Sequence, residues 1–479
     1  MTFIARHWID GQWRESDRVA ESTDPATGEV VGRYADGGRA EAEQSVRAAR
    51  RAFEQTEWSR DRALRHKVLS AMADAFGARA GELALTLTTE NGKTLVESGM
   101  EVASAGPAFR HTAAQALTET GIAAEVANGV YFSTLTEPAG VAALIIPWNA
   151  PVALFVRALA PALAAGNTVV AKLPGQTALT NALMAEIISE VQDLPRGVVN
   201  IFTESGNTGA PFLVESPDVD VVSFTGSVAV GKAVAAAGAA TLKRINLELG
   251  GKTPLIVFDD ADVAAAIPVL AASMTAFAGQ FCMAGTRFLV HRAVADAVRD
   301  GLRDALESIV VGPGRLATTQ MGPLIDKAAV RRVDEAVERS LAYAKPIVRG
   351  GPITTAPFAA GAFYRPSLLA VEDVNSPLVQ EELFAPVATF EVFDDEDDAV
   401  RRANATEFGL AAAVFTRDVD RARRVGRALR AGTVWTNTWF VLDDGFAEGG
   451  FKSSGIGRLR GPLATAAFGE AKTYVQISR

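Results

Sequence analysis

The sequence predicts an α/β protein built on a doubly wound parallel sheet, and three observations lead to that prediction. Between Gly140 and about Glu248, short apolar runs alternate with amphipathic helical stretches, as in a parallel sheet covered by helices on both faces. The same alternation returns between about Thr253 and Trp435, which predicts a second α/β region. With 479 residues, the chain is also too long for one ordinary core, so two or three domains are expected.

Composition excludes several classes of protein. Hydrophobic residues make up 48% of the chain and charged residues 22%, which is typical of a globular protein. The formal net charge is -9 and no basic cluster is interleaved with aromatic residues, so nucleic acid is not an expected partner. A single cysteine excludes an internal disulfide and fits the reducing cytoplasm, which is the expected compartment.

Neither a membrane nor a metal is an expected partner. Residues 1–7 hold no apolar core long enough for a secretory signal. The long charge-free run from Val263 to Thr286 is rich in alanine and contains Pro268, which favours a buried helix over a membrane span. The four histidines and the one cysteine show no metal-ligand spacing.

The first 140 residues predict a hairpin, a helical layer and a strand. Asp10-Gly11 lies between apolar residues, which is a strong hairpin signal. From Arg39 to about Thr118, apolar residues recur every three or four positions and predict helices. Residues 130–136 alternate in polarity and predict a strand, which we expect to leave the body of its domain as an arm.

The strand and helix repeats follow in order along the chain. Strands are predicted at 141–146, 167–172, 198–202 and 219–224, with helices near 151–165, 177–192 and 207–215. Ligands of such sheets bind at the carboxyl ends of the strands. Three segments occupy that position, namely 147–149, 172–175 and 225–227.

The second region begins with a strand at 254–258, followed by a helix that carries Cys282 and a strand at 287–291. The acidic run 394–398 is expected to start a solvated helix. The final segment, 472–477, predicts a strand without a hairpin partner beside it. It is expected to pair outside its own domain, and a neighbouring subunit is one possible partner.

Cys282 is the only thiol of the chain and the first candidate for chemistry. A thiolate is a strong nucleophile near neutral pH, and the small neighbours Gly279, Ala284 and Gly285 would let a ligand approach. An unpaired cysteine is also commonly a small buried hydrophobe, and the residue alone leaves both interpretations open.

Three other features admit a functional and a structural interpretation. Residues 223–231 run from a strand through Gly226 into a helix, which either presents free N–H groups to a phosphate or only turns the chain. Glu248 has apolar neighbours at a strand end, so it is a general base with a raised pKa or an edge carboxylate bonded to loop amides. Asn149 could hold an oxyanion or simply form a turn.

Taken together, six motifs in unbroken order resemble the NAD(P)-dependent aldehyde dehydrogenase superfamily. The motifs are Pro147-Trp148-Asn149, Phe224-Thr225-Gly226-Ser227 with Gly231, Glu248-Leu249-Gly250-Gly251-Lys252, Gly279-Gln280-Phe281-Cys282, Glu381-Glu382-Leu383-Phe384-Ala385-Pro386-Val387 and Gly449-Gly450-Phe451-Lys452. They span almost the whole chain, which makes catalysis the expected role of Cys282.

The resemblance implies a division into domains. A nucleotide-binding domain would comprise 1–118 and 138–250, and a catalytic domain 251–435. Residues 436–460 would return to line the active site and pack on the nucleotide domain. Residues 119–137 and 461–479 would form a small β arm, which implies a homodimer or homotetramer.

The resemblance also implies roles in catalysis. Cys282 would attack the aldehyde carbon, and the Asn149 amide with the Cys282 N–H would hold the thiohemiacetal oxyanion. A thioester would remain after hydride transfer. Glu248 would activate the water that releases the acid, or relay the thiol proton earlier.

For the cofactor, NAD or NADP, the resemblance implies a set of contacts. Lys172 would meet the adenosine ribose, Trp148 and Ser227 the phosphates, Glu382 the nicotinamide ribose and Phe384 the ring, with Gly226, Gly231 and Leu249 completing the site. Gly175 departs from the glutamate that many NAD-preferring relatives carry, and its lack of charge predicts use of both cofactors. A second departure is Leu459, where relatives usually carry an acid.

Substrate choice is expected to depend on residues around the aldehyde tunnel. The predicted lining is Ala150, Leu154, Arg157, Phe281, Met283, Trp439 and Leu442. The segment 147–152 with Arg157 looks like the benzaldehyde, vanillin and salicylaldehyde branch, since small Ala150 leaves room for a ring. Arg157 could instead hold the distal carboxylate of a semialdehyde, or form a structural ion pair at a helix surface.

Two other classes of function compete with this one. The chain could be a binding or structural protein that keeps the fold without turnover, although the presence of Cys282, Glu248 and Asn149 together weighs against that. It could also be a cysteine hydrolase, which normally needs a histidine base, and no histidine here has a motif context.

Overall fold

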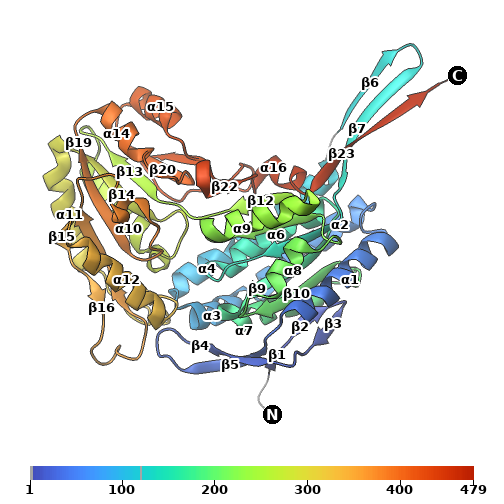
Figure 1. The fold of residues 1–479 in the computed structure, drawn as a ribbon, viewed down its shortest axis with the longest axis horizontal. Coiled ribbons are helices and arrows are strands. Elements are labelled where there is room, and N and C mark those ends of the chain that lie inside the picture. Colours follow the sequence, from blue (N-terminus) through green and yellow to red (C-terminus); the bar gives the residue numbers. More distant parts are fainter. Residues whose placement is uncertain (1–3, 119–120, 479) are drawn as a thin grey trace.

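Two α/β lobes and a projecting arm make up the chain in the computed structural model, which describes residues 4–118 and 121–478 (Figure 1). The first lobe carries the helical layer of the N-terminal part, and the second lobe holds most of residues 253–436. The arm leaves the first lobe and ends in free space (Figure 1). The doubly wound α/β fold predicted from the sequence is confirmed.

The first lobe is built on an eight-stranded sheet whose five central strands are parallel. The chain passes from β8 through β9 to β10 and then crosses to β11 and β12, so the order of the strands reverses at β8. The carboxyl edge of a sheet at such a reversal is the usual ligand site. In spatial order the strands are β22 (Gly455–Ile456), β12 (Arg244–Glu248), β11 (Val221–Thr225), β8 (Val141–Ile145), β9 (Thr168–Pro174), β10 (Val199–Glu204), β2 (His7–Ile9) and β3 (Gln12–Arg14).

Helices cover both faces of this sheet, and α6 is the most deeply buried of them. Every residue of α6 except Ala153 is buried, and apart from Arg157 the helix is apolar on all sides. The helices of the lobe are α1 (Arg39–Gln55), α2 (Arg62–Ala78), α3 (Ala80–Asn91), α4 (Leu95–Ala103), α5 (Ala105–Thr118), α6 (Pro151–Ala164), α7 (Ala178–Ser189), α8 (Gly209–Glu215) and α9 (Val228–Gly238). The helical layer predicted for 39–118 is therefore confirmed.

The N-terminal hairpin is also confirmed. β2 and β3 pair antiparallel, and Asp10 and Gly11 form their turn with φ of 55° and 64°. Positive φ at both positions gives the tight turn that matches the twist of the strands. Beside this hairpin, β1 (Ile4–Ala5), β5 (Val30–Ala35) and β4 (Val19–Thr23) form a small three-stranded sheet.

The second lobe contains a seven-stranded sheet that is parallel except at β15. Its strands in spatial order are β15 (Lys345–Val348), β18 (Ser367–Ala370), β19 (Val387–Phe393), β14 (Gly285–His291), β13 (Thr253–Val257), β20 (Ala411–Phe415) and β21 (Thr433–Thr436). Its helices are α10 (Val263–Thr275), α11 (Ala295–Glu307), α12 (Lys327–Ser340), α13 (Pro377–Gln380), α14 (Glu396–Ala403) and α15 (Val419–Ala428). A two-stranded ribbon joins β16 (Gly351–Pro352) to β17 (Tyr364–Arg365). The acidic run starts α14 with Asp395 as its N-cap, as predicted.

The prediction of a helix that carries Cys282 is wrong. α10 ends at Thr275, so the charge-free run is helical only in its first half. Phe277, Ala278 and Gly279 then adopt left-handed φ values of 53°, 53° and 68°, which stop the helix. Cys282 lies in the turn between this segment and β14.

The arm is a three-stranded antiparallel sheet of β6 (Ile122–Ala127), β7 (Val130–Pro138) and β23 (Gly469–Ile477). The C-terminal strand therefore pairs with β7 of its own chain, across nine residue pairs. α16 (Gly461–Ala466) leads into β23. Residues 119, 120 and 479, which the predicted arm includes, lie outside the described residues. Within 4–118 and 121–478, no helix combines the length and the apolar character needed to cross a membrane.

Candidate active site

A cavity of about 280 Å³ lies at the carboxyl edge of the first sheet, and both lobes contribute to its walls. The three side chains predicted to be catalytic, those of Cys282, Glu248 and Asn149, all line it. They come from three separate segments that the fold brings together. The complete lining is Pro147, Trp148, Asn149, Leu154, Thr225, Gly226, Ser227, Glu248, Leu249, Gly250, Cys282, Glu382 and Phe384.

Close backbone packing holds the Cys282 turn in place. A Cβ on Gly251 would lie 2.4 Å from the carbonyl oxygen of Cys282, so only glycine fits at that position. A Cβ on Gly279 would likewise lie 2.2 Å from the carbonyl carbon of Ala385. Glycines at these two positions let three chain segments meet at the thiol.

Asn149 reaches the same turn from the first lobe. Its Nδ2 donates a hydrogen bond to the carbonyl oxygen of Gln280 at 3.1 Å, and the side chain is buried. An amide nitrogen carries two hydrogens, so the second remains available to an oxygen bound near Cys282. Asn91 fixes the preceding residue by donating to the carbonyl oxygen of Trp148 at 2.8 Å. This arrangement is suited to hold a negatively charged oxygen.

Burial raises the pKa of Cys282 to about 12, while the Arg157 guanidinium opposes the rise and the Glu448 carboxylate adds to it. A thiol with such a pKa attacks a carbonyl only after a base removes its proton.

Glu248 ends β12 beside the thiol and has the properties of that base. Burial raises its pKa to about 8, against the guanidinium groups of Arg157 and Arg458. Its Oε1 is buried without a protein partner, so the carboxylate is free to accept a proton. The raised pKa is what the apolar sequence context predicts.

Six of the residues predicted to bind the cofactor lie together at the cavity, namely Trp148, Gly226, Ser227, Leu249, Glu382 and Phe384. The rings of Trp148 and Phe384 meet edge to face with centroids 5.7 Å apart. Glu382 Oε1 accepts from the Gly251 N–H at 3.1 Å, and a Cβ on Gly250 would lie 2.0 Å from Glu382 Oε2. Ser227 lines the cavity and is the N-cap of α9, and the N-terminus of a helix attracts anions such as phosphate.

Lys172, Gly175 and Gly231, which are also predicted to bind the cofactor, lie outside this lining. Lys172 lies in β9, and burial lowers its pKa against the carboxylates of Glu204 and Asp36. Gly175 starts the turn after β9, and a Cβ there would lie 2.5 Å from the Tyr34 hydroxyl. Gly231 lets α9 approach Leu249, because a Cβ would lie 2.6 Å from its methyl groups.

A cluster of aromatic rings, here called the aromatic wall, lies next to Cys282 but outside the lining of the 280 Å³ cavity. The predicted substrate residues Phe281, Met283, Trp439 and Leu442 therefore do not line that cavity. Phe281 packs against Phe440 with ring centroids 4.7 Å apart, and against Trp439 at 6.1 Å. Trp439 Nε1 donates to the carbonyl oxygen of Met283 at 2.9 Å, which ties this wall to the residue after Cys282. Leu442 packs on the same apolar cluster. Ala150 is buried at the N-cap of α6, and Leu154 lines the cavity one turn further on.

Arg157 does not line the catalytic cavity. It is only 7% exposed and forms an ion pair with Glu448, while its Nη2 donates to Thr225 Oγ1 at 3.3 Å. One of the roles predicted for Arg157 from the sequence is a structural ion pair at a helix surface. The pair exists, but it is buried.

Three residues of the site were not found from the sequence. Phe440 completes the aromatic wall, and its place after Trp439 was a usable signal. Glu97 accepts a hydrogen bond from the N–H of Phe277 at 2.6 Å. Glu448 neutralises the positive charge of Arg157 in an ion pair. Because both carboxylates act on segments far away in the sequence, no local pattern could reveal them.

Comparisons with known proteins agree with this geometry. The model of the aldehyde dehydrogenase family matches residues 13–474. A betaine aldehyde dehydrogenase of Sinorhizobium fredii is 39% identical over 99% of this chain and 98% of its own. A phenylacetaldehyde dehydrogenase of Pseudomonas fluorescens is 36% identical over 98% of this chain and 95% of its own. A crystal structure of betaine aldehyde dehydrogenase from Staphylococcus aureus in complex with NAD+ superposes with a TM-score of 0.96 and 34% identity, over 99% of this chain and 95% of that chain.

Proposed function

The chain belongs to the aldehyde dehydrogenase family, and we propose that it oxidises an aldehyde to the carboxylic acid with Cys282 as nucleophile and Glu248 as base. The single observation that carries this proposal is the convergence of Cys282, Glu248 and Asn149 on one cavity. The family makes the protein an oxidoreductase that acts on aldehydes, and the roles of the individual residues are our inference.

The proposed reaction begins with loss of the thiol proton. Glu248 takes the proton of the thiol, and the sulfur of Cys282 bonds to the aldehyde carbon, whose oxygen becomes an anion held by the Asn149 amide. The nicotinamide cofactor, when bound, accepts the hydride that leaves this carbon. A thioester on Cys282 remains. Glu248 gives the thiol proton to solvent before the second half of the reaction. Water then attacks the thioester carbonyl while Glu248 takes a proton from that water, the carbon–sulfur bond breaks, the Cys282 thiolate regains a proton from Glu248, and the acid leaves.

Residues on the cavity edge fit a nicotinamide dinucleotide. The N-terminus of α9 with Ser227 suits a phosphate, Glu382 suits ribose hydroxyls, and the Trp148 and Phe384 rings suit a flat base. We propose that both NAD and NADP are used, since Gly175 brings no carboxylate to the ribose. An NAD to NADP ratio of catalytic efficiencies above about 100, equal to about 2.7 kcal/mol, would contradict dual use.

For the substrate we propose an aromatic aldehyde, supported by the wall of Phe281, Trp439 and Phe440 beside Cys282. A quaternary ammonium aldehyde is a second candidate, because aromatic faces also attract such cations and two relatives described above are named betaine aldehyde dehydrogenases. A carboxylate-bearing semialdehyde is less well supported, since Glu448 already compensates Arg157.

A panel of aldehydes tests these proposals by the absorbance of the reduced nicotinamide. Benzaldehyde, phenylacetaldehyde, betaine aldehyde, succinate semialdehyde and hexanal are compared, each with NAD and with NADP. Replacing Phe440 by Leu should lower kcat/KM for the aromatic aldehydes about tenfold and spare hexanal. Equal efficiency with all five would contradict a specific pocket. Thioester hydrolysis without any dinucleotide dependence would instead favour a cysteine hydrolase, and no turnover at all would favour a binding protein.

We further propose the domain division 1–118 with 138–250, 251–435, 436–460, and an oligomerisation arm of 119–137 with 461–479. The arm exposes large apolar side chains, among them Ile122, Val475 and Ile477, which supports assembly into a homodimer or homotetramer. Light scattering of the full chain, compared with an Ile122→Ser variant, tests this. The single thiol supports the reducing cytoplasm as its compartment.

A further inference from the structure

A network of four charged side chains, two of them buried, lies behind the catalytic cavity. Arg157 pairs with Glu448, Glu448 accepts a second hydrogen bond from Arg460 Nε at 2.7 Å, and Arg460 pairs with Asp444. Arg157 is 7% exposed and Glu448 is 5% exposed. Asp444 is partly exposed, so the network runs from the interior of the protein to its surface.

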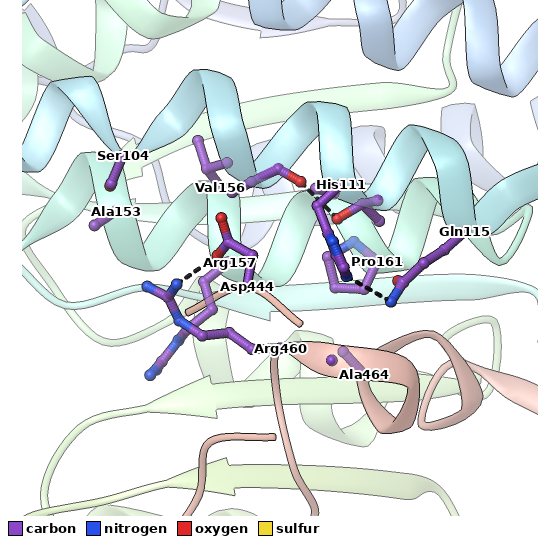
Figure 2. Close-up of a pocket in the computed structure, with 14 residues that line it drawn as sticks. Ser104, His111, Gln115, Ala153, Val156, Arg157, Pro161, Asp444, Arg460 and Ala464 are labelled. Atoms are coloured by element: carbon purple, nitrogen blue, oxygen red, sulfur yellow. Dashed lines mark hydrogen bonds and ion pairs between the residues drawn. The ribbon is translucent and has the colours of Figure 1, made fainter. Parts of the chain in front are cut away.

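The network borders a second, much smaller cavity between α5 and α6. Arg157, Asp444 and Arg460 lie on one side of it, and His111 and Gln115 lie on the other (Figure 2). Its volume of about 20 Å³ is enough for about one water molecule. An aldehyde with a distal carboxylate could not reach the guanidinium through it.

The Arg157–Glu448 pair flanks Glu248 from two elements. Arg157 contacts Thr225, which lines the catalytic cavity and pairs with Glu248 across β11 and β12. Glu448 directly precedes Gly449, where a Cβ would lie 3.0 Å from Glu248 Oε1. Both Arg157 Nε and Glu248 Oε1 are buried without a protein partner. The pKa of a titratable group that is buried away from water depends strongly on nearby charges.

The backbone of Glu448 is fixed by pairing with another segment of the chain. Its backbone exchanges two hydrogen bonds with Leu459, at 2.7 and 2.8 Å. This isolated bridge holds the Glu448 carboxylate where it meets both Arg157 and Arg460.

We propose that Arg157 and Glu448 are positioning residues that form one compensated charge pair, which sets the protonation of Cys282 and Glu248 and receives no substrate carboxylate. The two charges act in opposite directions. The guanidinium favours the thiolate and the ionised Glu248, whereas the Glu448 carboxylate disfavours both. The remaining charges that face these groups are Arg458, Glu382 and, beyond Glu448, Arg460.

Alkylation of the thiol by iodoacetamide tests the pair without any dehydrogenase turnover. Cys282 is the only cysteine, so mass spectrometry of the full chain reports one site. At about pH 8, which is far below the pKa of the Cys282 thiol, the rate of alkylation is proportional to the fraction of Cys282 that is ionised. Glu448→Gln should raise that rate at least about threefold, and Arg157→Met should lower it by a similar factor. The double variant should fall between the two.

Activity supplies a second readout, which rests on the proposed function. The pH midpoint of kcat, if set by Glu248, should fall in Glu448→Gln and rise in Arg157→Met, by about half a unit or more each. The conservative variants Glu448→Asp and Arg157→Lys keep the charges. They should therefore leave the rate of alkylation and the pH midpoint of kcat unchanged. If Arg157→Met does not fold, Arg460→Gln removes a cation from Glu448 at a less buried place and should also slow alkylation.

The outcomes separate this inference from the proposed function. Alkylation rates that stay unchanged, or that move in the same direction in both single variants, overturn the inference even if the enzyme oxidises aldehydes. Opposite changes in rate support it even if the aldehyde panel shows no turnover. A loss of turnover with succinate semialdehyde alone in Arg157→Lys would overturn it in favour of a substrate-binding Arg157.

Discussion

Glu97 and Phe277 are 180 positions apart, yet the Glu97 carboxylate accepts the backbone N–H of Phe277 at 2.6 Å. The same carboxylate caps α4 by accepting from the Thr94 N–H at 2.9 Å. Phe277 begins the left-handed segment that leads to Cys282. One buried acid of the first lobe thus holds the turn of the second lobe that carries the thiol.

Glu97→Gln should loosen that turn. We expect kcat to fall about tenfold, because small displacements of a reacting group are costly, and the free energy of unfolding to fall by about 1–3 kcal/mol. Steady-state kinetics and urea denaturation measure both effects. Glu21→Gln, which breaks an exposed pair with Arg33, is the matched control and should change neither. Unchanged kcat in Glu97→Gln would contradict a positioning role.

Cys282→Ala should abolish aldehyde oxidation, with a loss of roughly three orders of magnitude or more, since no other thiol can replace it. Binding of the dinucleotide, followed by fluorescence, should persist because the cofactor residues are untouched. Oxidation that survives in this variant would exclude Cys282 as the nucleophile.

Asn149→Ala should lower kcat about 10²–10³-fold, the usual loss when one donor to an oxyanion is removed. KM should change little, since the amide acts mainly on the charge that forms during reaction. Asn375→Ala, at an exposed loop position, serves as the control. A change confined to KM would instead assign Asn149 to substrate binding.

Glu248→Gln should alter the pH dependence of stability. Burial raises the pKa of Glu248 to about 8, so the folded protein keeps this proton where the unfolded chain has lost it. The wild type therefore loses stability at this site as pH rises from about 5 to about 8, and a glutamine removes that loss. Urea denaturation across this range should show that the free energy of unfolding of the variant rises relative to that of the wild type as the pH increases. Parallel curves would mean that Glu248 is ionised in the native state at neutral pH.

Gly251→Ala should displace the Cys282 turn, because the added methyl group would lie 2.4 Å from the Cys282 carbonyl oxygen. We expect a loss of at least about 1–3 kcal/mol in stability and a marked loss of kcat. Gly77→Ala in α2 is the matched control, since nothing lies within 4 Å of its Cβ position, and alanine there should be neutral or stabilising by about 0.5–1 kcal/mol. Equal behaviour of the two variants would contradict the close approach.

The sequence predicts much of this site because parallel sheets follow a simple rule. Asn149, Ser227 and Glu248 each follow or end a strand, and the carboxyl ends of parallel strands meet at one edge. Glu248 has apolar neighbours in the sequence and in the fold alike, so the direction of its pKa shift was also predictable.

The parts that the sequence could not predict depend on long-range contacts. Phe277 and Ala278 are ordinary helix residues by type, and only their packing forces them into left-handed φ and ends the helix before Cys282. Arg157 was predicted on α6, but its partner Glu448 is 291 positions away. Pairing of that kind depends on how the return segment crosses the first lobe, and no local periodicity encodes it.

The order in which the arm strands are synthesised has a consequence for how the protein is made. Thr134 of β7 and Thr473 of its partner β23 are 339 positions apart, so β7 emerges from the ribosome long before β23. Until then β7 exposes an open hydrogen-bonding edge together with Tyr131, Phe132 and Leu135, a surface prone to intermolecular pairing. A premature stop codon before residue 469 would leave that edge open permanently, so nonsense products of this gene are expected to aggregate rather than merely lack activity.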